Sequence, residues 1–101
     1  MDRREYLAIC YIEELAEVVK EAAKCLRFTF DHRHVDYNET NQEKLEHELD
    51  DLEGIRVMLA REGVVLKSDP NRIRDKILRT EELIRLSTKM GVVRYNETGN
   101  H

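Results

Sequence analysis

The residues of this chain best suited to chemistry are two pairs of carboxylates, each pair spaced three residues apart. Glu14 and Glu17 form the first pair, and Glu48 and Asp51 form the second. Side chains three residues apart lie on one face of a helix, so each pair offers neighbouring oxygen ligands. Glu48 falls inside the apolar stripe of its own segment and Glu14 at the edge of another, which predicts that both face an interior.

Four carboxylates that face one interior would repel one another strongly, so this arrangement needs a compensating charge. A ligand set made only of carboxylate oxygens indicates a hard divalent cation, Mg²⁺ with Mn²⁺ as a substitute. Such ions also bind substrate phosphates, which predicts metal-assisted hydrolysis of a phosphoryl substrate. The alternative hypothesis is a non-catalytic helical dimer or adaptor, in which the inward acids pair with Arg56, Arg61 or the bases of residues 67–90.

Three helices are predicted to position these residues. The first covers about residues 3–28, and its expected apolar face consists of Leu7, Tyr11, Leu15, Val18, Ala22 and Cys25. The second begins with a capping box, Thr40 as N-cap and Glu43 three residues later, and continues to about Glu62. The third begins at Asp69, with Pro70 in the first turn, and ends at Gly91.

The composition suits one helical domain. The chain has 101 residues, is 38% charged and carries a net charge of −4, which argues against binding to a nucleic-acid polymer. No apolar run approaches the roughly 20 residues of a membrane span, and the first residues lack the apolar core of a signal peptide. We therefore expect a cytoplasmic protein with a single domain over residues 1–91 and a polar tail over 92–101, and no membrane partner.

Charge and apolar patterning further predict self-association. Residues 39–62 contain eight acids and three bases, whereas residues 67–90 contain seven bases and four acids, so the two segments are expected to neutralise each other. The third helix divides its apolar residues between two faces, one with Ile73, Ile77 and Ile84 and the other with Leu83, Leu86 and Met90. Two apolar faces suggest two packing partners, one of them a second subunit.

At the carboxylate pairs, the chain resembles the MazG-like all-α nucleotide pyrophosphohydrolases, in particular their short, phage-type members. Glu13-Glu14-x-x-Glu17 followed by Glu48-x-x-Asp51 is similar to the EExxE…ExxD signature of that family. The flanking segments "EELAEVVKEAAKCLRF" and "TNQEKLEHELDDLEGIRVML" are also similar to its first two helices. The 30 residues between Glu17 and Glu48 are at or beyond the long end of the family's usual gap.

The resemblance implies an all-α antiparallel helical bundle completed by oligomerisation, as a homodimer or homotetramer. It implies Mg²⁺-dependent hydrolysis of a nucleoside triphosphate to the monophosphate and pyrophosphate, with dGTP or another purine deoxynucleotide as the suggested substrate. Its metal ligands would be Glu14, Glu17, Glu48 and Asp51. If the chain is phage-encoded, the host cytoplasm is its expected location.

Further roles are predicted along the first helix and the loop after it. Glu17 or Glu21 would position or deprotonate the attacking water. The expected substrate contacts are Lys20, Lys24, Arg27, Phe30 and His32, to which His34 and Tyr37 of the same loop add candidate base contacts.

Overall fold

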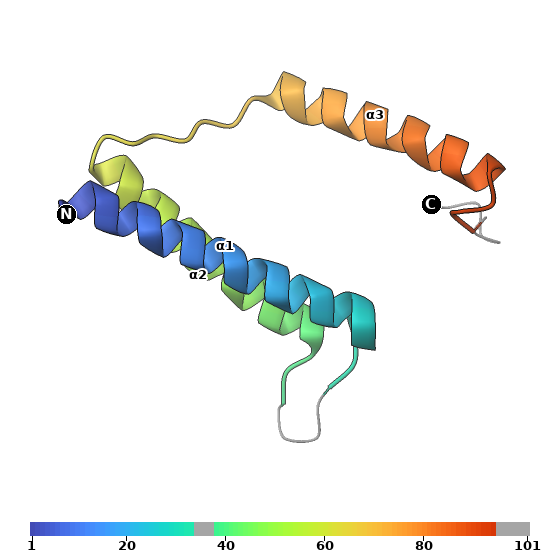
Figure 1. Ribbon diagram of the computed structural model, residues 1–101, viewed down its shortest axis with the longest axis horizontal. Coiled ribbons are helices and arrows are strands. Elements are labelled where there is room, and N and C mark those ends of the chain that lie inside the picture. The colour runs from blue at the N-terminus through green and yellow to red at the C-terminus, as the bar shows by residue number, and fades with distance from the viewer. Residues whose placement is uncertain (34–37, 95–101) are drawn as a thin grey trace. The chain divides into compact units, whose positions relative to one another are not determined.

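The computed structural model describes residues 1–33 and 38–94 and contains three α-helices in this range: α1 (Arg3–Phe28), α2 (Asn41–Arg61) and α3 (Pro70–Lys89) (Figure 1). The described residues form no strand, apart from one isolated bridge between Arg33 and Thr40. The prediction of an all-α protein is therefore confirmed. No helix in the described part of the chain is long and apolar enough to span a membrane.

Local capping explains where each helix begins. The Asp2 carboxylate accepts a hydrogen bond from the Glu5 backbone N–H at 2.8 Å, and the Asp69 carboxylate accepts from that of Asn71 at 2.9 Å. At α2 the capping box is complete, because the Thr40 hydroxyl accepts from the Glu43 N–H while the Glu43 carboxylate accepts from the Thr40 N–H. These bonds satisfy N–H groups that the first turn of a helix leaves without partners.

The chain divides into two compact units, residues 1–66 and residues 67–101. The first unit is a hairpin in which α1 and α2 run antiparallel side by side (Figure 1). The second unit contains α3, which buries none of its residues. The single domain expected over residues 1–91 stays a prediction, and of the expected tail residues 95–101 lie outside the described range.

Hydrogen bonds and an ion pair close both ends of the hairpin. At one end the buried Asn41 side chain donates to the Thr29 carbonyl at 2.9 Å, and the Asn41 N–H donates to the His32 carbonyl at 3.1 Å. At the other end Arg3 forms an ion pair with Glu62. These contacts fix the register in which the acidic side chains of α1 face those of α2.

The hairpin has a small core. Among the described residues, the buried hydrophobic side chains are Leu7, Cys25 and Leu59. Leu15 and Ala22, which were expected on the core-facing side of α1, are exposed. In the hairpin, one neighbouring helix covers only a narrow stripe of α1 and leaves the rest of its wide apolar face exposed.

Candidate metal centre

Three of the four predicted ligands come together midway along the hairpin. Carboxylate oxygens of Glu14 on α1 and of Glu48 and Asp51 on α2 all lie within 4.8 Å of one another. Glu14 and Glu48 are half-buried, whereas Asp51 is exposed. The group therefore opens to solvent on one side, as a site that binds a substrate phosphate must.

Glu17, the fourth predicted ligand, lies close to this group but is not part of it. Its carboxylate forms an ion pair with Lys20 at 3.9 Å, and its side chain is about half exposed. Glu17 still acts on the site electrostatically, because its charge raises the pKa of Glu48.

Glu48 is the member of the cluster whose pKa is raised by its surroundings. Its pKa is raised above the usual value of 4.5, first because the protein partly removes it from water, and then because of the charges of Asp51, Glu17, Glu14 and Glu21. Loss of water and nearby like charges both disfavour the ionised carboxylate. A divalent cation among these oxygens would reverse the second effect.

Glu21 is a fifth carboxylate of this region, and it is buried to 6% relative exposure. Lys24 donates to its Oε1 at 3.4 Å, whereas its Oε2 has no hydrogen-bond partner among the described residues. A buried carboxylate oxygen without a partner is costly. The charge of Glu21 contributes to the raised pKa of Glu48, so Glu21 acts on the cluster electrostatically, although its oxygens are not part of the ligand group.

The donor set fits a hard cation. Carboxylate oxygens from two helices, with solvent access on one side, suit Mg²⁺ or Mn²⁺, which keep several water ligands. The Oε2 of Glu21, which has no hydrogen-bond partner among the described residues, is a second buried acceptor near this cluster. Glu14, Glu48 and Asp51 would hold the ion, with Glu17 adjacent.

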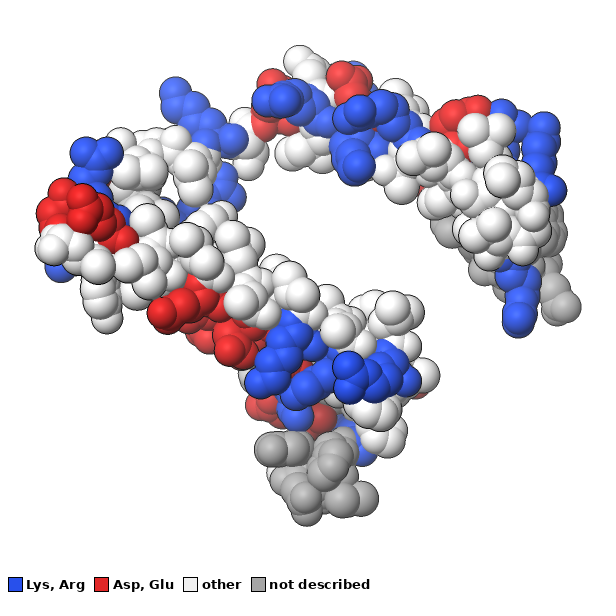
Figure 2. Space-filling model, in the orientation of Figure 1, with Lys and Arg blue, Asp and Glu red and all other residues white. Residues whose placement is uncertain are grey.

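Basic side chains follow the acidic cluster toward the end of α1. Figure 2 shows acidic side chains gathered midway along the hairpin and basic ones beside them, toward the α1–α2 connection. Lys20, Lys24 and Arg27 belong to this part of α1. Lys20 and Lys24 are engaged with Glu17 and Glu21, respectively, so both are held next to the candidate centre.

The rings of Phe28 and His32 lie close together at the end of α1 and the start of the loop that follows it. The Arg27 guanidinium lies 5.4 Å from the centre of the Phe28 ring, and the His32 ring lies 6.3 Å from the same centre at a tilt of 34°. Arg27 and His32 are two of the predicted substrate contacts, and both lie near the ring of Phe28, for which no such role was predicted. Phe30 is half exposed, and no ring among the described residues stacks against it. His34 and Tyr37 lie outside the described residues.

Comparison with known proteins adds no assignment, since no family model, no curated protein and no solved structure matches this chain. The candidate function therefore depends on the geometry of the site and on the sequence resemblance.

Proposed function

We propose that this protein is a Mg²⁺-dependent nucleoside triphosphate pyrophosphohydrolase that acts as a homo-oligomer. The observation that carries the proposal is the meeting of Glu14, Glu48 and Asp51 from two helices within 4.8 Å. These residues are three of the four that the MazG-like signature would assign to the metal. In the reaction, water forms a bond to the α-phosphorus, the bond to the β-phosphate oxygen breaks, and the products are a nucleoside monophosphate and pyrophosphate.

Each group of the site has a role in this proposal. A bound Mg²⁺ would neutralise phosphate charge and lower the pKa of water. Glu14, Glu48 and Asp51 would hold the Mg²⁺ ion, and Glu17 adds negative potential beside them. Glu21 accepts the proton of the attacking water at Oε2, which has no hydrogen-bond partner among the described residues, while Lys24 donates to Oε1. Charged side chains at fixed positions suit such roles because they need no reorganisation during the reaction.

Substrate contacts are proposed for the segment beyond the acids. Lys20 and Arg27 bind the phosphate groups, for which Arg is well suited because its planar guanidinium contacts two oxygens at once. The Phe28 and His32 rings offer a surface on which a nucleobase could stack. A purine deoxynucleotide such as dGTP presents the largest ring for this surface and is the substrate that we propose to test first.

The test is pyrophosphate release from the common NTPs and dNTPs, measured with Mg²⁺ and with EDTA. We expect release from at least one nucleotide that EDTA abolishes. Glu48→Gln should lower this rate roughly 100-fold or more, because it removes a ligand at the centre of the cluster. Glu46→Gln is the matched control, since Glu46 is an exposed residue of the same helix outside the cluster, and it should keep wild-type activity.

The non-catalytic adaptor makes a different prediction for the same experiment. The ion pair between Lys24 and Glu21 is the contact that favours it, because it shows one buried acid already neutralised by a base. If no nucleotide is hydrolysed with Mg²⁺ or Mn²⁺ present, and Glu48→Gln changes only stability, the acids are structural and the enzyme proposal fails.

A further inference from the structure

Two lysines of α1 each form an ion pair with the glutamate three residues before them, and the two pairs differ in burial. Lys20 Nζ lies 3.9 Å from a carboxylate oxygen of Glu17, and the two side chains are 60% and 47% exposed. Lys24 Nζ lies 3.4 Å from Oε1 of Glu21, and these side chains are 34% and 8% exposed. The sequence repeats Glu-x-x-Lys in both places, so only the structure separates the two lysines.

The pair of Lys20 and Glu17 leaves its lysine available to a ligand. An ion pair between two exposed side chains contributes little to stability, because water screens both charges. Lys20 can therefore exchange the Glu17 carboxylate for a phosphate oxygen at small cost, in agreement with its proposed contact to the phosphate groups.

Lys24 is paired with a carboxylate that needs it more. A buried carboxylate requires a compensating charge or hydrogen bonds, and removal of one partner from a buried ion pair leaves the other charge uncompensated. Oε1 of Glu21 accepts from Lys24, whereas Oε2 has no hydrogen-bond partner among the described residues. If Lys24 moved to a phosphate group, Glu21 would lose this compensation inside the hairpin.

We propose that Lys24 is a positioning residue that acts through Glu21 and does not contact the substrate, in contrast to the role that the sequence suggests. The inference rests on the proposed function, in which Oε2 of Glu21 accepts the proton of the attacking water. By donating to Oε1, Lys24 fixes the orientation of the carboxylate and leaves Oε2 as the acceptor. A base that is held in one orientation needs no rearrangement when the water reacts.

The first experiment compares the steady-state kinetics of Lys24→Gln and Lys20→Gln, with Mg²⁺ and the nucleotide that the wild type hydrolyses fastest. Lys24→Gln should lower kcat roughly 10-fold or more with little change in KM, because the base loses its orientation while substrate binding is retained. Lys20→Gln should instead raise KM, since it removes a phosphate contact. Lys24→Arg should restore most of kcat, because arginine also donates to a carboxylate. A rise in KM for Lys24→Gln like that for Lys20→Gln would overturn the proposal.

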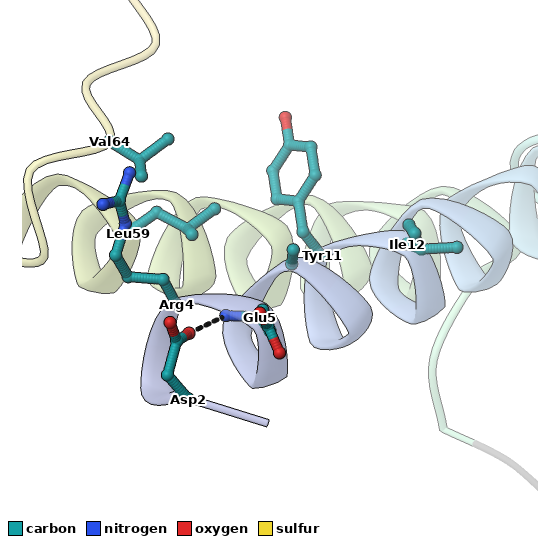
Figure 3. Close-up of a pocket in the computed structure, with 8 residues that line it drawn as sticks. Asp2, Arg4, Glu5, Tyr11, Ile12, Leu59 and Val64 are labelled. Carbon is teal, nitrogen blue, oxygen red and sulfur yellow. Dashed lines mark hydrogen bonds between the residues drawn. The ribbon is translucent and has the colours of Figure 1, made fainter.

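Arg4→Gln is the matched control, because it removes one positive charge from the same helix at a place remote from the acids. Arg4 lines a mostly apolar hollow of about 540 Å³ near the start of α1, together with Asp2, Glu5 and Tyr11 (Figure 3). It precedes Lys24 by 20 residues, or about 30 Å along the helix. Arg4→Gln should keep the kcat and KM of the wild type. A loss of kcat as large as that of Lys24→Gln would show an effect of overall charge and contradict the proposed role.

The second experiment is a double-mutant cycle that asks whether Lys24 acts through Glu21. In a Glu21→Gln background, Lys24→Gln should cause no further loss of the residual kcat, because the carboxylate that it orients is absent. Chemical denaturation should show the same coupling, with a smaller loss of stability in this background because no buried charge is left uncompensated.

The outcomes of the cycle separate this inference from the proposed function. Equal losses of kcat or of stability in the two backgrounds of an active enzyme would overturn the role of Lys24 alone. A wild type that hydrolyses no nucleotide would overturn the proposed function, and the catalytic role of Lys24 with it.

Discussion

At the scale of single residues, the acidic cluster stores unfavourable electrostatic energy that only a cation or a proton can relieve. Glu48 shows this directly, since partial removal from water and four neighbouring acids raise its pKa. Glu21 adds a buried oxygen that has no hydrogen-bond partner among the described residues. Such an arrangement is typical of functional sites, where stability is lower than packing alone would give.

The pH dependence of stability should report Glu48 directly. Because its pKa is higher in the folded protein than the unfolded value of 4.5, the folded state binds the proton more tightly. Its stabilising contribution is then complete below pH 4.5 and is lost as the pH rises through the folded-state pKa. We expect Glu48→Gln, compared with wild type in EDTA, to abolish this loss of stability above pH 4.5, as measured by chemical denaturation.

Other carboxylates change the stability with pH in the opposite direction. The contribution of Glu48 must therefore be taken as the difference between the wild type and the Glu48→Gln variant. Glu43 has a lowered pKa, mainly because the Thr40 backbone N–H donates to it, and its contribution is lost as the pH falls. Glu46→Gln serves as the control, with a pH profile like that of wild type. If the stability of Glu48→Gln changes with pH in parallel with that of the wild type, the raised pKa of Glu48 does not lower the stability of the fold.

At the scale of elements, the junction after α1 holds an unfavourable backbone conformation at Thr29, the one non-glycine residue with positive φ in the described part of the chain. Thr29 has φ 70° and ψ 159°, a conformation that glycine adopts readily and that a β-branched residue rarely does. Contacts on both sides hold it there: the Asn41 side chain donates to its carbonyl, and the Gln42 N–H donates to the next carbonyl, that of Phe30, at 2.9 Å. The register of the hairpin is thus maintained against local strain.

Thr29→Gly should relieve this strain and stabilise the hairpin by about 1 kcal/mol, after allowance for the greater freedom of glycine in the unfolded chain. Urea denaturation would measure the change. Thr29→Ala is the matched control, because alanine also disfavours positive φ and should bring no gain. Equal stabilisation by both substitutions would mean that the hydroxyl, which donates to Asp31 at 2.9 Å, is the source of the effect rather than the backbone.

At the scale of the whole molecule, two faces of α1 have different surroundings in the hairpin. The face with Glu14 meets α2 and contributes to the candidate metal centre, whereas the stripe with Ile12, Val19 and Leu26, about 120° away, is exposed in the hairpin.

Mg²⁺ should stabilise the whole fold if the acids are ligands. A ligand that binds only the folded state raises its stability in proportion to the logarithm of ligand excess over the dissociation constant. For a domain of this size, Mg²⁺ at ten times that constant should raise the thermal midpoint by several degrees. Differential scanning fluorimetry at fixed ionic strength and protein concentration measures this rise, which Glu48→Gln should remove. Equal rises in both proteins would point to cation binding elsewhere on this acidic chain.

The helices could be predicted closely from the sequence, because their boundaries depend on local signals. The Thr40–Glu43 capping box and the Asp69–Pro70 start act within four residues, and both operate as expected. The carboxylate pairs were equally visible, since spacing by three places two side chains on one face of any helix. The all-α class and the residues that could bind a metal were thus determined by the sequence itself.

The convergence of those residues was decided by the tertiary structure. Whether Glu14, Glu17 or Glu21 faces Glu48 depends on the stagger of α1 against α2, which the Asn41 and Arg3 contacts at the two ends set across long separations in sequence. The same stagger buries Glu21 and leaves Leu15 and Ala22 outside. Apolar periodicity alone could not separate the core-facing stripe of α1, with Leu7 and Cys25, from the exposed stripe with Ile12, Val19 and Leu26. The two stripes merge into one wide arc on the helix, and only the position of α2 divides them.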